Sequence, residues 1–213
     1  MKEEVNLEIS VRRNFGPPIG NAIMPEFLID QLNNFVDDQI DKNSQLSKEL
    51  DFGSNLAGQV KQEIKLPNDI IQPDLLSFLG NVSKHYIKLS CKKDISEFKI
   101  IDAWIVRQFE NDYNPMHYHS GHLSGVGYIK LPDNFGVSPN KTKKDNPNGN
   151  ISFQYGVKQF LANGHVSYKP KLGDFYIFPN YLYHSVHPFY GEGERRSVSF
   201  NAFIDDKIYN VYA

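Results

Sequence analysis

The stretch that decides the fold is Gly173–Ile204, GDFYIFPNYLYHSVHPFYGEGERRSVSFNAFI. It holds three short runs rich in aromatic and β-branched residues, which Pro179 and a glycine-rich turn separate. Runs of this kind are typical of antiparallel strands. The sequence therefore predicts strands over Asp174–Phe178, Tyr183–His187 and Arg195–Ile204.

Short runs of the same composition extend upstream as far as Phe98. Four further strands are predicted there, at Lys99–Phe109, Ser124–Leu131, Ile151–Tyr155 and Val166–Lys169. Strands this short and this close together fit a double-sheet jelly roll. The predicted fold class is therefore mainly β: a cupin-like jelly roll, or double-stranded β-helix, with supporting N-terminal α-helices.

The first hundred residues differ in their hydrophobic period. Alternating apolar residues over Val5–Val11 predict one short strand, and apolar residues at helical spacing then predict helices over Pro25–Lys42 and Pro73–Leu89. A length of 213 residues suits one domain. We therefore expect a single domain over residues 1–213, with a helical flank at 1–97 and a jelly-roll core at 98–204.

Composition excludes several classes of protein. The net charge of -2, from 23 Lys and Arg against 25 Asp and Glu, disfavours a strongly basic nucleic-acid binder. No apolar run approaches the roughly 18 to 20 residues of a spanning helix, so we expect no membrane insertion. The single cysteine, Cys91, excludes an internal disulfide and favours a reducing compartment, which we take to be the cytoplasm.

Six of the seven histidines lie within residues 117–187. His117 and His119 are two residues apart, and a strand places such side chains on one face, where both imidazoles can reach one ion. His184 begins a later strand and is the preferred third ligand. His187 is its rival, but its offset of three residues points it to the opposite face. Three such imidazoles would leave positions open on a six-coordinate metal.

The last predicted strand carries a charged residue on a face that should be buried. Arg195, Ser197, Ser199 and Asn201 alternate on one side of it. An arginine facing the interior of a barrel needs a partner, and a bound carboxylate could accept a forked pair of hydrogen bonds from it, with a third from the Ser197 hydroxyl. The alternative is that Arg195 and Arg196 are exposed charges at the start of the strand.

Five short motifs follow one another in this part of the chain: H-x-H at 117–119, S-G-V-x-Y at 124–128, G-D-x-x-x-F-P at 173–179, H-x-V-x-P at 184–188 and R-x-S-x-S-F-N at 195–201. Together they cover roughly residues 100 to 204. In their order and spacing they resemble the 2-oxoglutarate and Fe(II)-dependent oxygenases.

The resemblance implies a site and an activity. Fe(II) would be held by His117, His119 and His184, and 2-oxoglutarate would chelate the iron. The distal carboxylate of 2-oxoglutarate would accept hydrogen bonds from Arg195 and Ser197, and a further one from the phenol of Tyr128. The expected cosubstrate-binding residues are therefore Arg195, Ser197 and Tyr128. Dioxygen and 2-oxoglutarate would be consumed, succinate released and the substrate hydroxylated, with ascorbate as an optional stimulant. The substrate would be a small molecule or a peptidyl side chain, prolyl included.

One position departs from the wider superfamily, which has an acidic residue two places after the first histidine. This chain has His119 there. A neutral third ligand leaves the metal centre one unit more positive. Asp112 or another carboxylate is therefore kept as an alternative ligand.

Two other functions stay open at this point. The first is a cupin-type metal protein without 2-oxoglutarate, because residues 173–184 partly reproduce a cupin motif. The second is a non-catalytic jelly-roll module for binding or structure. The entrance of the site is expected to be lined by Tyr113, Tyr118, His122, His165 and the polar segment Asp133–Asn150. This segment contains Lys141, Lys143 and Lys144, and it is either a lid over the site or a solvated loop.

Overall fold

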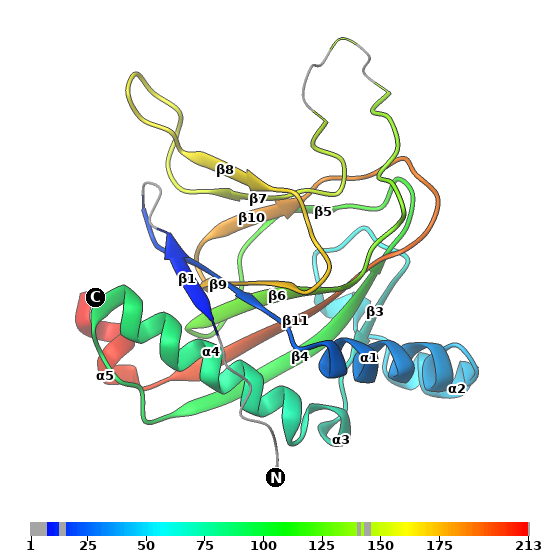
Figure 1. Cartoon of the computed structure of the whole chain (residues 1–213), viewed down its shortest axis with the longest axis horizontal. Coiled ribbons are helices and arrows are strands. Elements are labelled where there is room, and N and C mark those ends of the chain that lie inside the picture. Colours follow the sequence, from blue (N-terminus) through cyan, green and yellow to red (C-terminus); the bar gives the residue numbers. More distant parts are fainter. Residues whose placement is uncertain (1–7, 13–15, 140–141, 143–145, 213) are drawn as a thin grey trace.

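Two antiparallel sheets face each other in the computed structural model, which describes residues 8–12, 16–139, 142 and 146–212 (Figure 1). The larger sheet has the order β1 (Ile9–Arg12), β2 (Ile19–Ile23), β9 (Asp174–Pro179), β6 (Leu123–Lys130), β11 (Arg195–Ile204), β4 (Phe98–Gln108), β3 (Gln62–Lys65). The smaller sheet has the order β5 (Asn114–His117), β10 (Tyr183–Val186), β7 (Ile151–Gln154), β8 (His165–Tyr168). The predicted mainly β jelly-roll class is confirmed, and each of the seven strands predicted after residue 98 is present.

The first hundred residues contain more strand than the sequence predicts. β2 pairs with β9 and β3 pairs with β4, so both complete the larger sheet. The expectation of helices alone after the first strand was wrong, because four- and five-residue strands such as QEIK are too short to show a period. Of the first predicted strand, Ile9–Arg12 is β1, while Val5 and Leu7 lie outside the described residues.

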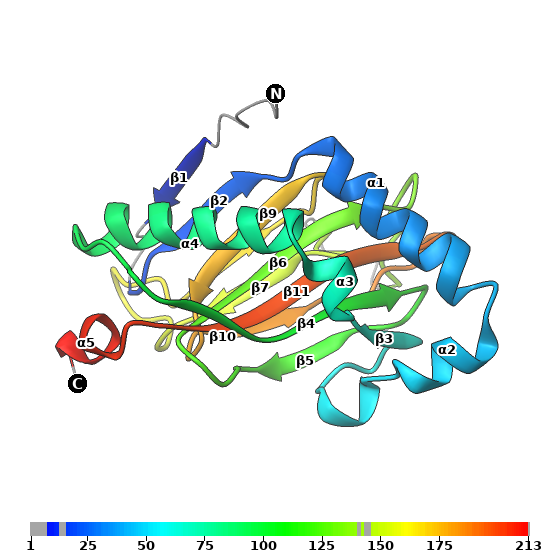
Figure 2. The same cartoon turned by 90° about the horizontal axis from the view of Figure 1, so that it is seen from below.

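Helices cover the outer face of the larger sheet (Figure 2). The predicted helix over Pro25–Lys42 is confirmed as α1 (Glu26–Asn34) followed by a π-helical stretch (Phe35–Ile40), and that over Pro73–Leu89 as α4 (Asp74–Cys91). Their buried apolar residues, among them Leu32, Leu79 and Val82, form one core with Val198, Phe200 and Phe175 of the sheet. The shorter helices are α2 (Ser44–Glu49), α3 (Asn68–Ile71) and α5 (Asp206–Tyr209), with 3₁₀ turns at Gly53–Asn55 and Asn210–Tyr212. Among the described helices, none has both the length and the apolar character needed to cross a bilayer.

β11 has one apolar face and one polar face, as its alternation predicts. Val198, Phe200 and Ala202 point into the core beneath the helices. Arg195, Ser197 and Ser199 point the other way, into a cavity between the two sheets. A cluster of aromatic and aliphatic residues fills the rest of the space between the sheets, and it consists of Ile19, Val126, Tyr128, Ile151, Phe153, Tyr176, Phe178, Leu182 and Val186.

A buried ionic network fastens the helical layer to the larger sheet. Glu194 accepts hydrogen bonds from Arg107 Nε at 2.7 Å and from Arg196 Nε and Nη2, both at 2.8 Å. Arg196 also donates to Asp37 at 2.8 Å, and Arg107 donates to Asp41 at 2.5 Å. Because Arg196 is held on the helical side, its neighbour in the strand must point into the cavity.

Replacing Glu194 by glutamine should lower the free energy of unfolding by about 3 kcal/mol, because two buried guanidinium groups lose their shared anion. Burial alone would raise the pKa of Glu194, but hydrogen bonds from Arg196 and Arg107 outweigh it and lower the pKa to about 2. A lowered pKa contributes stability above the unfolded value, near 4.5, and that stability is lost as the pH falls towards 2. Urea unfolding at pH 7 and at pH 3 measures both effects.

The exposed neighbour Glu192 supplies the matched control. Glu192→Gln should change the free energy of unfolding by less than about 0.5 kcal/mol at either pH. Equal stabilities of the Glu194→Gln protein and the wild type at pH 7 would show that the network contributes nothing.

Candidate metal and cosubstrate site

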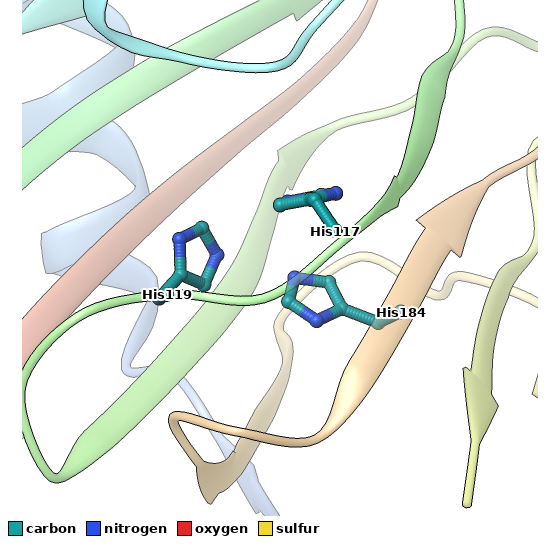
Figure 3. Close-up of side chains that lie close together, drawn as sticks. All are labelled: His117, His119 and His184. Atoms are coloured by element: carbon teal, nitrogen blue, oxygen red, sulfur yellow. The ribbon is translucent and has the colours of Figure 1, made fainter.

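Three histidines reach one point from two strands and a loop (Figure 3). His117 ends β5 and lies opposite His184 of β10 in the antiparallel pairing, so both side chains share a face. His119 lies beyond the end of β5, not in the strand as expected, because the chain leaves the sheet before the turn at Gly121. Its backbone is held by Asn180, which accepts from the His119 N–H at 3.0 Å and donates to the His119 carbonyl at 3.1 Å.

The three imidazoles are close enough to share one metal ion. Ring centroids are 4.3 Å apart for His117 and His184, and 4.9 Å apart for each of the other two pairs. One ring nitrogen of each histidine lies within 4.8 Å of those of the other two. A metal at their centre would have three nitrogen ligands on one side and open positions on the other.

Backbone carbonyls orient two of the rings. His117 Nδ1 is 2.7 Å from the Pro115 carbonyl oxygen, and His184 Nδ1 is 2.9 Å from that of Leu182. A carbonyl only accepts, so each Nδ1 carries the proton and each Nε2 presents a lone pair. Such hydrogen bonds to metal-ligating histidines set the tautomer and the ring orientation.

Burial keeps all three imidazoles neutral. It lowers the pKa of His117, and it lowers the pKa of His184 well below the usual value. Burial, with a smaller contribution from His117, lowers the pKa of His119 to about 3. Neutral imidazole is the form that binds a metal, so the cluster needs to release no proton at neutral pH. The donor set therefore fits a divalent transition metal.

A second feature of the cavity is a buried arginine with unused donors. Arg195 is 1% exposed, and its Nη1 donates to Gln108 Oε1 at 3.0 Å. Its Nε and Nη2 have no hydrogen-bond partner among the described residues, nor has the hydroxyl of fully buried Tyr128. The guanidinium lies over the Tyr128 ring, 4.7 Å from its centroid. Burial lowers the pKa of Arg195. The alternative, in which Arg195 and Arg196 are exposed charges, is wrong for both residues.

Unsatisfied buried donors are costly, and a carboxylate is the acceptor that suits a guanidinium fork. Ser197 lies next to Arg195 on the same face of β11 and opposite Tyr128 of β6. Arg195 and Ser197 line the cavity, while Tyr128 lies against the Arg195 guanidinium and is not among the lining residues. The three histidines, Arg195 and Ser197 line the same cavity, whose volume is about 210 Å³.

The alternative ligands lie elsewhere. His187 Nε2 is 2.9 Å from Ser152 Oγ, and His187 does not belong to the cluster. Asp112 accepts hydrogen bonds from the backbone N–H groups of Lys61 and Phe109, both at 2.9 Å, and so stabilises a turn.

Of the residues considered for the entrance, Tyr118 lines the cavity. His122 stacks on Tyr209 at 3.9 Å between ring centroids and borders a different pocket. Tyr113, His165 and the described part of Asp133–Asn150 are not among the lining residues. Lys141, Lys143 and Lys144 lie outside the described residues.

The sequence reasoning missed one wall of the cavity. It is formed by residues that no motif marks: Asn55, Leu56, Ala57, Glu63, Trp104 and Asn114. Four of them precede residue 98, in the part of the chain expected to support the core only. Glu63 and its neighbour Ile64 point to opposite faces of β3. A strand of four residues is too short for the sequence pattern to predict these faces.

A family model described as "Putative 2OG-Fe(II) oxygenase" matches residues 102–201. Over these residues the chain is similar to this oxygenase family. The matched segment contains the three histidines, Arg195, Ser197 and Tyr128. None of the curated proteins compared with the chain is similar to it in sequence.

Solved structures share the fold of the chain at low sequence identity. A prolyl-4-hydroxylase from Pseudomonas putida is 15% identical, with a TM-score of 0.51 over 93% of this chain and 92% of that chain. The viral collagen prolyl hydroxylase vCPH from Paramecium Bursaria Chlorella virus-1, solved as a 2OG complex, is 14% identical, with a TM-score of 0.54 over 86% and 94%. AviO1 from Streptomyces viridochromogenes Tue57 is 12% identical, with a TM-score of 0.56 over 88% and 90%.

Proposed function

We propose that the chain is one oxygenase domain that uses Fe(II), 2-oxoglutarate and dioxygen to hydroxylate a prime substrate, with release of succinate and carbon dioxide. The observation that carries the proposal is the juxtaposition, in one cavity, of three neutral histidines and an arginine with two unpaired donors. The three histidines are suited to bind a metal ion, and the arginine is suited to bind a carboxylate. A cosubstrate that chelates a metal and ends in a carboxylate satisfies both.

In this proposal His117, His119 and His184 hold the iron through nitrogen lone pairs. Bound iron supplies the activation of dioxygen and of the keto acid. Arg195 grips the distal carboxylate through Nε and Nη2, and the hydroxyls of Ser197 and Tyr128 donate to it.

Aromatic and aliphatic side chains pack around the histidine cluster. The rings of Phe153 and Phe178 lie 6.0 Å and 4.8 Å from that of His184, and Trp104 packs edge-on against His119 at 5.6 Å. Val126, Ile151 and Val186 add apolar lining. In this proposal the apolar side chains limit the access of water, which strengthens the interactions of charged groups and protects a reactive centre from side reactions.

The prime substrate is a small molecule or a peptidyl side chain. A prolyl residue is among the candidates, because two neighbours in fold are named as prolyl hydroxylases. The single cysteine favours a reducing compartment, and we propose the cytoplasm.

Succinate release tests the proposal. The purified protein is incubated with Fe(II), 2-oxoglutarate, dioxygen and ascorbate, and succinate is measured against a sample treated with a chelator. We expect slow succinate formation without a prime substrate, and none after metal removal. Stoichiometric metal binding without any 2-oxoglutarate binding would instead indicate a cupin-type metal protein. Failure to bind metal would indicate a non-catalytic jelly-roll module.

A further inference from the structure

A carboxyl group lines the cavity on the side away from the proposed cosubstrate residues. It belongs to Glu63 of β3, the edge strand of the larger sheet (Figure 2). Ile64 points into the core beneath the helices, so Glu63 points to the opposite face, into the cavity. Glu63 is 2% exposed. This carboxyl has no part in the binding of metal or cosubstrate described above.

The strand register places Glu63 relative to the cosubstrate residues. Glu63 lies opposite Val106 of β4, and Val106 lies opposite Ser197 of β11, so the three share one row of the inner face. Two strand spacings put the Glu63 and Ser197 backbones roughly 10 Å apart. Glu63 is also outside the group of residues that can share the metal. Glu63 and the three histidines line the same cavity, so one ligand can contact both.

The part of the chain that the structure describes offers this carboxyl no partner. Among the described residues, none donates a hydrogen bond to Glu63 or forms an ion pair with it. The backbone passes close by, since a Cβ at Gly58 would lie 2.7 Å from Glu63 Oε1 and 3.0 Å from Asn114 Nδ2. Burial, and then the charge of Asp51, raise the pKa of Glu63 to about 7. Because Glu63 is buried and lines the cavity without a described partner, its carboxyl is available to a ligand that enters the cavity.

We infer that Glu63 binds a protonated amine of the prime substrate and thereby selects compact, free amines. The inference rests on the proposed function, because it names the substrate class of the same cavity. An ammonium group both donates hydrogen bonds to the carboxylate and neutralises it, which a hydroxyl or an amide cannot do. The cavity volume of about 210 Å³ leaves room for a small group only. A proline within a peptide has no N–H on its nitrogen and does not meet this requirement.

Binding of matched probes to the whole protein tests the inference. The protein is loaded with Zn(II), a redox-inert ion, and with 2-oxoglutarate. Pyrrolidine, cyclopentylamine and n-butylamine are then compared with their N-acetyl derivatives and with the neutral peptide acetyl-Gly-Pro-Gly-amide by saturation-transfer NMR and calorimetry. We expect at least one amine to bind, its N-acetyl form to bind about 30-fold more weakly or not at all, and the peptide not to bind.

Two variants separate the role of Glu63 from that of its surroundings. Glu63→Gln keeps the size of the side chain, and should weaken amine binding about 30-fold or more while leaving the affinities for Zn(II) and 2-oxoglutarate unchanged. Asp51→Asn removes the nearby exposed carboxylate, which does not line the cavity, and should change amine binding by less than about 3-fold. Circular dichroism checks that both variants are folded.

Several results would overturn the inference. They are equal binding of amines and N-acetyl derivatives, unchanged amine binding by Glu63→Gln, binding of the peptide alone, and no amine binding by a protein that does bind Zn(II) and 2-oxoglutarate. Loss of Zn(II) affinity in Glu63→Gln would overturn the inference as well, because it would mean that the negative charge of Glu63 stabilises the bound metal ion and not an amine. If the wild type binds neither Zn(II) nor 2-oxoglutarate, the proposed function itself fails.

Discussion

His184→Ala is expected to abolish stoichiometric metal binding and to lower succinate release by about 1,000-fold or more. Loss of a group that only orients a metal ligand already costs about 10- to 100-fold, and loss of a ligand should cost more. His184 is 5% exposed and lies against Phe153 and Phe178, so the residues packed around it offer no donor to replace the imidazole. Metal content after anaerobic loading with Fe(II), and succinate release by the same samples, measure the two effects.

The matched control is His187→Ala. This histidine is three residues away and contacts Ser152 rather than the cluster, so the variant should keep the metal. Retention of one equivalent of iron by His184→Ala, with its loss from His187→Ala, would reverse the assignment of the third ligand.

Arg195→Ala is expected to raise the dissociation constant for 2-oxoglutarate by about 100-fold or more and to leave metal content unchanged. The reason is the loss of two charge-assisted hydrogen bonds in a buried site. Calorimetric titration of the Zn(II)-loaded protein with 2-oxoglutarate measures this affinity. Arg195→Lys keeps the charge but lacks the planar guanidinium. Its affinity for 2-oxoglutarate should lie between those of the alanine variant and the wild type.

Exposed Arg12 provides a control for the removal of one positive charge. Arg12→Ala should leave the affinity for 2-oxoglutarate within about 2-fold of the wild type, since salt screens distant surface charges. Unchanged affinity in Arg195→Ala, or a loss of metal from it, would mean that the arginine does not bind the distal carboxylate.

The catalytic half of the chain could be predicted because its patterns are local. β11 alternates polar and apolar residues from Ser197 to Ala202, enough to place Arg195 and Ser197 on one face and Val198 and Phe200 on the other. The long stripes of α1 and α4 predict helices in the same way. β2 and β3 could not be predicted, because a strand of four or five residues is stabilised by its partners β9 and β4 and not by its own sequence.

The histidine cluster was predictable in part. The H-x-H spacing and the later His184 indicate three ligands, but the spacing wrongly keeps His119 within the strand. In the structure, hydrogen bonds with Asn180 hold the loop of His119 in place, and Asn180 is 61 residues away. A contact over that separation leaves no trace in the spacing of the motif.

Residue types and periods were therefore sufficient for the jelly-roll class, for His117 and His184 and for the inward-facing arginine, because each depends on which face of a strand a side chain occupies. The burial of Arg195 without partners for Nε and Nη2, and the arrival of Glu63 beside the same cavity, depend on the pairing of β3, β4 and β11. Pairing between strands far apart in the chain is a property of the folded sheet. It brings an unmarked glutamate from the supporting region to the cavity that the three histidines and Arg195 line.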